Sequence, residues 1–250
     1  MVSLTRAFLV LLASLLVGLG HLRANEAAIA RARAYLGSEA DLAAVRSLLF
    51  KGELSVVGRQ GGTPITARIE IAFQKPDRQL ITATAPDKIE TTALNGYEAW
   101  QRDIDPANPS LTRVGLLGRD PIKRLRANTF ENLSFYRGIE GVGGRVEDRG
   151  MVTIDGVECL KLAFIHAADV VFIRSFDRAT GRLVQTETDN GGLIREEGEI
   201  LSGGLRFPRR TTTTNTLPDG SVRAISITFS EVLVNPVLPD ELFVIPAQIP

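Results

Sequence analysis

Apolar and polar residues alternate with a period of two along most of this chain. Residues 66–73 (TARIEIAF) show the pattern clearly, and residues 160–164 and 225–230 repeat it. Such alternation is typical of antiparallel strands that bury one face. Between residue 49 and the C-terminal end we count about ten or eleven such runs.

The runs are separated by short glycine-containing pairs. Glycine, and to a lesser degree asparagine and aspartate, tolerates the positive φ angles that tight hairpin turns need. The pairs are Asn95-Gly96, Asp155-Gly156, Thr180-Gly181, Gly203-Gly204 and Asp219-Gly220. Their positions predict hairpins, and hence strands that pair mostly with their neighbours in sequence.

Two helices are predicted ahead of the strands. Residues 26–36 (EAAIARARAYL) are rich in alanine and are followed by Gly37, a common helix stop. A second short helix is predicted from Ser38 and Asp41 through Leu48.

A third helical segment is predicted at residues 119–138, between the two groups of strands. Asp120 is suited to cap it and Pro121 fits the first helical turn. The pattern allows the helix to restart at Thr129.

These elements predict an α+β fold that is mainly antiparallel β. A sheet of this many strands twists and curls, so it closes or is covered. We therefore expect an incomplete, curved β-barrel whose open side is covered by helices, with a hydrophobic cavity between them. Residues 25–250 are expected to form a single domain.

The first 24 residues have the pattern of a secretory signal peptide. Arg6 precedes an apolar segment at residues 7–20, and a polar stretch ends at Ala24, after which we expect cleavage. An uncleaved N-terminal anchor is the alternative. No later segment is apolar over 18 residues, so the mature chain is expected to be a soluble periplasmic protein.

The amino-acid composition argues against nucleic-acid binding and against a metal site. The chain has 29 basic and 29 acidic residues; residues 1–24 contain two arginines and no acid, which leaves a net charge of −2. That balance argues against nucleic-acid binding. A single cysteine, Cys159, and two histidines leave little material for a metal site, so neither metal nor cofactor is expected.

Catalytic patterns are weak. His166 lacks the nucleophile motif that a catalytic histidine needs, and is interpreted as a loop or strand-end residue. Glu196, Glu197 and Glu199 suggest paired carboxylates, but they follow Arg195 and are interpreted as a solvated strand edge. We therefore predict that the protein is not an enzyme.

Four segments, taken in order, resemble a known family. Residues 95–100 hold Asn-Gly ahead of Trp100, residues 177–183 fit D-x-x-T-G-x-L, residues 204–208 fit G-x-x-F-P, and residues 238–246 fit L-x-D-x-x-F-x-I-P. This succession resembles the LolA/LolB-type outer-membrane lipoprotein-sorting superfamily. Each motif alone is a turn or strand-edge pattern, and it is their order that carries the resemblance.

The resemblance implies an incomplete barrel whose cavity accepts acyl chains of lipoproteins or other lipids. No cysteine follows the leader, so the chain resembles the soluble LolA-like carrier rather than the anchored receptor. Inner- and outer-membrane transport proteins are the implied partners, and a monomer is expected. In the transport members an arginine on the barrel binds the lid, but no motif assigns that role to an arginine of this chain.

The candidate cavity lining consists of apolar residues expected to point inward from strands. They are Ile69, Ile71, Ile81, Trp100, Leu162, Phe164, Ile227 and Phe229. Ordinary core packing is the alternative for each.

The first functional hypothesis is a periplasmic carrier that moves lipoprotein acyl chains or another lipid between membranes. The second is a periplasmic sensor or scaffold of the same fold that binds a protein partner in envelope regulation.

Overall fold

The computed structural model describes residues 25–57, 64–217 and 219–246. The predicted leader and its cleavage after Ala24 lie outside the described residues. Within those ranges, no helix has both the length and the apolar character needed to cross a membrane.

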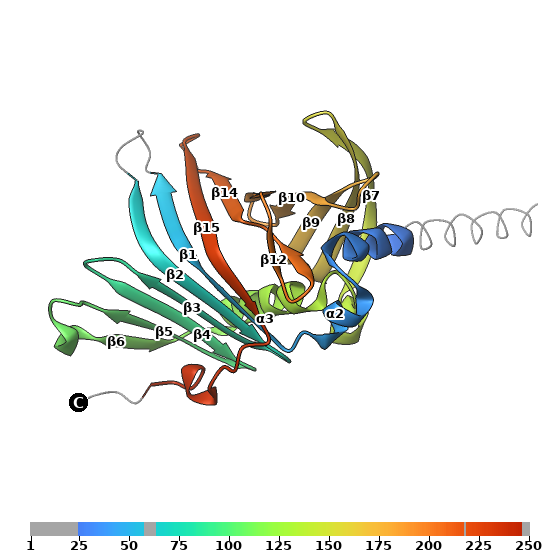
Figure 1. Ribbon diagram of the computed structural model, residues 1–250. Coiled ribbons are helices and arrows are strands. Elements are labelled where there is room, and N and C mark those ends of the chain that lie inside the picture. Colours follow the sequence, from blue (N-terminus) through green and yellow to red (C-terminus); the bar gives the residue numbers. More distant parts are fainter. Residues whose placement is uncertain (1–24, 58–63, 218, 247–250) are drawn as a thin grey trace, which may run out of the picture.

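A single antiparallel sheet of thirteen strands forms the body of the protein (Figure 1), in the order β6-β5-β4-β3-β2-β1-β15-β14-β11-β10-β9-β8-β7. The sheet is strongly curved and does not close, since β6 and β7 lie at its two edges. The strands are β1 (Ser47–Val57), β2 (Ile65–Gln74), β3 (Arg78–Thr84), β4 (Ile89–Asn95), β5 (Glu98–Ile104), β6 (Arg113–Leu116), β7 (Arg145–Ile154), β8 (Val157–Ala167), β9 (Val170–Asp177), β10 (Leu183–Thr188), β11 (Leu193–Glu197), β14 (Arg210–Thr216) and β15 (Val222–Val234).

The predicted fold class is confirmed. The predicted number of strands, about ten or eleven, is too low, since the described residues form strands β1 to β15. A separate two-stranded sheet pairs β12 (Ile200–Ser202) with β13 (Leu205–Phe207). Strands of three or four residues, such as these and β6, are too short to show a period of two.

The two N-terminal helices follow one another near one end of the sheet (Figure 1). Residues 25–36 are helical, and α2 (Glu39–Ala44) follows, with the side chain of Ser38 accepting a hydrogen bond from the Asp41 backbone N–H at 3.1 Å. The second helix is shorter than predicted, because Leu48 belongs to β1 and is buried in the core.

The third helix, α3 (Arg119–Ser134), is continuous and lies across the concave face, where it contacts β2, β3, β4 and β9 (Figure 1). Gly118, not Asp120, occupies the N-cap position. The helix does not restart at Thr129. That side chain donates a hydrogen bond to the carbonyl oxygen of Leu125 one turn earlier, at 2.9 Å, and is completely buried.

Arg33 connects the first helix to the end of α3. Its guanidinium donates to the carbonyl oxygens of Ser134 and Phe135, at 3.0 and 2.7 Å, and is paired with Glu39. A cation at this position satisfies the last carbonyl groups of α3 and is favoured by the helix dipole.

The C-terminal segment covers part of the opposite, convex face. After β15 the chain is irregular except for one short 3₁₀ helix, η3 (Asp240–Leu242), and Phe243 is buried against Ala72 and Leu80. The indole N–H of Trp100 donates to the carbonyl oxygen of Phe243 at 3.0 Å. The L-x-D-x-x-F motif therefore holds the end of the chain onto the sheet.

Replacing Phe243 with alanine should lower the free energy of unfolding by about 3 kcal/mol, because it empties the pocket that this ring fills. Val244, the next residue, is 53% exposed. Val244→Ala is therefore the matched control and should change stability little. Urea unfolding of both variants measures the difference, and equal stability would contradict the packing role of Phe243.

Candidate functional site

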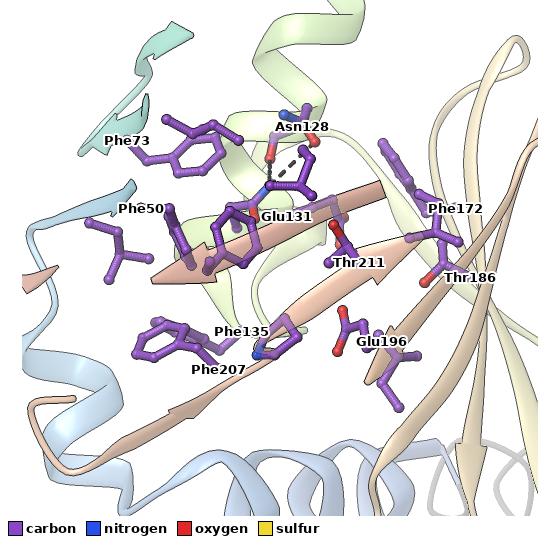
Figure 2. Close-up of a pocket in the computed structure, with 18 of the residues that line it drawn as sticks. Phe50, Phe73, Asn128, Glu131, Phe135, Phe172, Thr186, Glu196, Phe207 and Thr211 are labelled. Atoms are coloured by element: carbon purple, nitrogen blue, oxygen red, sulfur yellow. Dashed lines mark hydrogen bonds between the residues drawn. The ribbon is translucent and has the colours of Figure 1, made fainter. Parts of the chain in front are cut away.

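A cavity of ≈ 300 Å³ lies between the concave face of the sheet and the helices that cover it (Figure 2). Strands from both halves of the sheet supply its walls, and α3 and the first helix contribute the cover. Most lining side chains are apolar: Leu36, Leu48, Phe50, Ile71, Phe73, Ile81, Phe135, Phe172, Leu183, Ile194, Phe207, Ile227 and Phe229. An apolar enclosure of this kind suits a hydrophobic ligand.

Strand register explains why these residues meet. Phe50 is paired with Ile71, and Ile71 with Ile81, so the three side chains share the concave face. The Phe50 ring lies 5.6 Å from the Phe207 ring and 5.2 Å from the Phe229 ring, measured between centroids. Aromatic contacts at such distances are favourable and give the wall a defined shape.

The structure brings four of the predicted lining residues to the cavity: Ile71, Ile81, Ile227 and Phe229. Ile69 is buried two positions before Ile71 on β2, but it is not part of the cavity wall. Contact of the four with a ligand remains a prediction.

The other three predicted residues lie elsewhere. Leu162 and Phe164 are buried in a separate cluster with Ile139 and Phe176, where helical segments fill the space above the strands. Trp100 lies on the convex face, because its register partner Ala93 is paired with Leu80, which packs under the C-terminal segment. These three do not line the cavity.

Several lining residues were not among the sequence candidates. Phe73 follows Ile69 and Ile71 in the same alternation, so that signal was present in the sequence. Phe50 and Phe172 lie on strands whose inward side only the register identifies.

A buried ion pair links α3 to the sheet beside the cavity. Glu131 of α3 binds the guanidinium of Arg174 on β9, and its other carboxylate oxygen lies 2.5 Å from Nε2 of His166 on β8. Arg174 also lies 4.9 Å from the ring centroid of Phe164 and 5.0 Å from that of Tyr136, within cation–π range. His166 is at a strand end, as predicted, but its side chain is buried in this network.

The charges of the pair stabilise each other. Burial alone would raise the pKa of Glu131, but Arg174 and His166 outweigh it and hold the pKa below its ordinary value. Burial would lower the pKa of Arg174, and the Glu131 carboxylate more than offsets that effect. Both groups are therefore ionised at neutral pH, where each needs the other.

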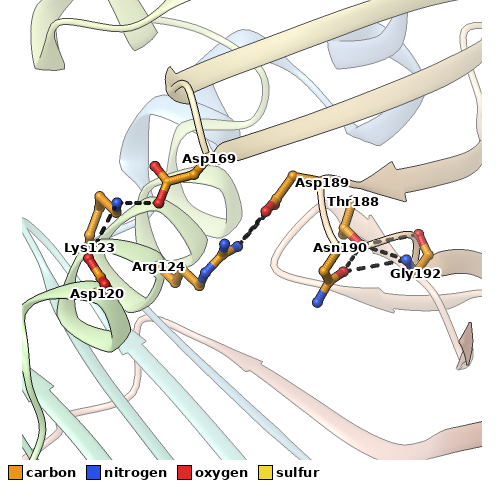
Figure 3. Close-up of polar contacts among 8 residues, drawn as sticks. All are labelled: Asp120, Lys123, Arg124, Asp169, Thr188, Asp189, Asn190 and Gly192. Atoms are coloured by element: carbon orange, nitrogen blue, oxygen red, sulfur yellow. Dashed lines mark hydrogen bonds and ion pairs between the residues drawn. The ribbon is translucent and has the colours of Figure 1, made fainter. Parts of the chain in front are cut away.

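Further polar contacts attach α3 to the strand connections on both sides of the cavity. On one side, Arg126 binds the Asp77 carboxylate at 2.7 Å and the carbonyl oxygen of Gly96 at 2.8 Å. On the other, Arg124 binds Asp189 at 2.8 Å and Lys123 binds Asp169 (Figure 3). The helix thus spans the curved sheet and is attached to both of its halves.

The turn that carries Asp189 is itself well ordered by hydrogen bonds. Thr188 Oγ1 donates to Asn190 Oδ1 at 2.6 Å and accepts from the Gly192 backbone N–H at 3.0 Å (Figure 3). The contact between Arg124 and Asp189 therefore joins α3 to a rigid turn.

A second cavity of ≈ 270 Å³, which we call the vestibule, adjoins the first. The two share wall residues that include Leu36, Tyr136 and Glu196. The vestibule is more polar, and its charged or hydroxyl-bearing wall residues are Tyr35, Tyr136, Arg182, Glu196, Glu199 and Arg206.

Glu196 points into the cavity beside Thr211, its cross-strand partner (Figure 2). The prediction that Glu196 lies on a solvated edge is wrong, because β11 is an interior strand between β10 and β14. Glu197, the next residue, is exposed on the other face. Burial raises the pKa of Glu196 to about 7, against the opposing effect of Arg174 and Arg182.

Within the described residues, no group of three or more His, Cys, Asp or Glu side chains is arranged to hold a metal ion. Cys159 is buried, as predicted, and burial raises the pKa of its thiol.

Comparison with known proteins supports the fold. No family model matches the sequence, and no curated protein matches it significantly. Among solved structures, a DUF1329 family protein from Desulfovibrio piger is similar with a TM-score of 0.57 and 11% identity, over 87% of this chain and 96% of that one. An outer membrane lipoprotein-sorting protein domain from Vibrio parahaemolyticus gives 0.56 and 12%, over 88% and 97%. A LolA superfamily protein from Nitrosomonas europaea gives 0.55 and 14%, over 84% and 98%. The chain therefore has a LolA-like fold, as the motifs predicted.

Replacing Glu131 with glutamine should lower the free energy of unfolding by about 3 kcal/mol, because it leaves Arg174 as an unpaired buried charge. Arg174→Met combined with Glu131→Gln should recover part of that loss, since no charge then remains. Glu140→Gln, at an exposed position after α3, is the control. If the double variant were no more stable than Glu131→Gln alone, the result would contradict the pairing of Glu131 with Arg174.

Glu196 should make stability depend on pH in the opposite sense from an ordinary carboxylate. Its pKa is raised from 4.5 to about 7 in the folded protein. The group therefore stabilises the fold fully below pH 4.5, and this contribution is lost as the pH rises through 7. Glu196→Gln should nearly match the wild type in stability at pH 4.5 and exceed it by about 3 kcal/mol at pH 8. Urea unfolding across this range measures the difference, which Glu197→Gln should not show.

Proposed function

We propose that this protein is a periplasmic carrier that holds acyl chains of a lipoprotein or another lipid in its cavity and moves them between membranes. The observation that carries the proposal is the apolar cavity between the curved sheet and α3. At ≈ 300 Å³ it lies at the lower end of the range of small-molecule sites, about 300–1,000 Å³. The vestibule adds ≈ 270 Å³ beside it.

The hydrophobic effect supplies enough free energy for capture. Each methylene group that leaves water contributes about 0.8 kcal/mol. About ten buried methylene groups therefore contribute about 8 kcal/mol, the free energy of a micromolar complex, before the loss of translational freedom is subtracted. The burial of one acyl chain is therefore the main favourable contribution to capture, and it exceeds the lower estimates of the association cost, about 4 kcal/mol.

The contacts of α3 support a role for this helix as a lid. The helix covers the cavity and is attached by ion pairs at its surface and by the buried pair of Glu131 and Arg174. Moving the helix outward would expose both charges of the buried pair to water, which solvates them and lowers the cost of separation. Arg174 thus takes the position of a barrel arginine that binds the lid, which the sequence motifs alone did not assign.

The site also supports binding rather than catalysis. His166 and Arg174 are both engaged with the same carboxylate, that of Glu131. The His166 ring also packs edge-on against the rings of Phe130 and Phe172, so its contacts hold α3 against the sheet.

The predicted leader supports a periplasmic location. In the proposed carrier the protein passes as a monomer between inner- and outer-membrane transport proteins, as the family resemblance implies. The solved structure from Vibrio parahaemolyticus, described as a lipoprotein-sorting domain, supports lipoprotein as the cargo class. The alternative, a sensor or scaffold that binds a protein partner, requires no acyl chain in the cavity.

Native mass spectrometry of the protein purified from the periplasm of a cell that exports it should show a bound lipid. Ile227→Trp, which fills the cavity from β15, should lose the adduct and bind a fluorescent fatty acid about tenfold more weakly, since it displaces roughly two methylene groups. Thr228→Trp places the same ring on the exposed side of β15 and is the control. An empty wild-type cavity together with a co-purifying protein would favour the sensor or scaffold instead.

A further inference from the structure

The vestibule contains two opposite charges that do not bind each other. Arg182 and Glu196 both contribute to its wall, next to the apolar cavity. Among the described residues, neither the guanidinium of Arg182 nor the carboxylate of Glu196 has a hydrogen-bond or ion-pair partner. Enclosed charges are normally paired, because removing them from water is costly.

The other charged groups of the vestibule are already paired. Arg206 donates two hydrogen bonds to Glu199, at 2.8 Å to each carboxylate oxygen, and Glu199 also accepts from the Tyr35 hydroxyl at 3.3 Å. This contrast singles out Arg182 and Glu196 as the groups left for a ligand.

The backbone that carries Arg182 is fixed in place. Asp177 accepts hydrogen bonds from the backbone N–H of Ala179 and from the Thr180 hydroxyl, at 2.8 and 2.7 Å, and the Arg182 backbone N–H donates to Thr180 Oγ1 at 3.2 Å. Gly181 has a φ of +81°, and a Cβ there would lie 2.5 Å from the carbonyl oxygen of Arg31 in the first helix. The D-x-x-T-G-x-L motif therefore presents Arg182, half-buried, at the vestibule.

We propose that the vestibule binds the zwitterionic headgroup of a phospholipid, with the phosphate on Arg182 and a primary ammonium group on Glu196, while the part of the acyl chains next to the headgroup occupies the apolar cavity. This inference rests on the proposed carrier function and adds the class of lipid to it. Guanidinium groups bind phosphate with two parallel hydrogen bonds, and a carboxylate is the natural partner of an ammonium group.

A headgroup that carries charge of only one sign fits the vestibule less well than a zwitterionic headgroup. An anionic headgroup would satisfy Arg182 but bring its charge close to Glu196, and a cationic one would leave Arg182 unpaired. A phosphate that carries an ethanolamine satisfies both, and it has the apolar tails that the adjoining cavity requires.

The ammonium contact should depend on pH, because it needs Glu196 in its ionised form. Burial raises the pKa of Glu196 to about 7, so the free protein has the carboxyl largely protonated at pH 6. The titratable and charged groups that surround it are Tyr35, Glu131, Tyr136, Arg174, Arg182, Glu199 and Arg206. Of these, Arg174 and Arg182 favour the ionised form but do not outweigh burial.

Displacement of a fluorescent fatty acid by short-chain lipids tests the proposal. Dihexanoyl-phosphatidylethanolamine and dihexanoyl-phosphatidylglycerol have the same chains and the same phosphate, and only the first has an ammonium group. At pH 8 the wild type should bind the ethanolamine lipid about tenfold more tightly, the value of one charged hydrogen bond. At pH 6 this preference should shrink.

Three variants assign the effect to residues. Glu196→Gln should bind both lipids equally at both pH values, and Arg182→Gln should weaken both lipids about tenfold, since each offers a phosphate. Glu197→Gln, on the exposed face of the same strand, should behave as the wild type.

Equal binding of the two lipids by the wild type at pH 8, or an unchanged preference in Glu196→Gln, would overturn the headgroup assignment while leaving the carrier function in place. Failure of the fluorescent fatty acid itself to bind would instead contradict the carrier function. The two failures are therefore distinguishable in one experiment.

Discussion

The curvature of a thirteen-stranded antiparallel sheet sets the main constraint on this protein. Its concave face is too wide for side chains of the sheet alone to fill, so another element has to cross it. That element is α3, which binds Asp77 and Gln79 on one half of the sheet and Arg174 on the other. These contacts are made by long polar side chains, which hold α3 at a distance from the strands. The space left between the helix and the sheet is the cavity.

The buried pair of Glu131 and Arg174 explains why α3 occupies one specific position over the sheet. A buried ion pair contributes little net stability compared with apolar packing, but its geometry admits only one partner arrangement. The Glu131 carboxylate lies between Arg174 and His166, and these directional contacts define one position of α3. In the proposed carrier, outward movement of α3 would bring both charges into water, so neither would be left unpaired in the interior.

The class of fold could be predicted because alternation and turn residues are local signals in the sequence. The residues that line the cavity could not all be predicted, because long-range packing determines which side chains face it. Alternation indicates that Trp100 and Gln101 face opposite sides of a strand, but not which side is concave. Leu162 and Ile71 share the concave face, yet helical segments fill the space over Leu162 and leave it open over Ile71. Residues 195–197 are all charged, so no apolar alternation marked Glu196 as inward-pointing.

Glu196 connects the stability of the fold to the proposed binding function. A carboxylate enclosed in a vestibule without a partner destabilises the empty protein at neutral pH, which is why its pKa rises to about 7. A ligand that brings a positive charge removes this penalty, so binding and stability increase together. An apolar side chain, such as that of Ile194 two positions earlier on the same face, would avoid this penalty. A destabilising charged group at the junction of two cavities therefore fits a binding role better than a packing role.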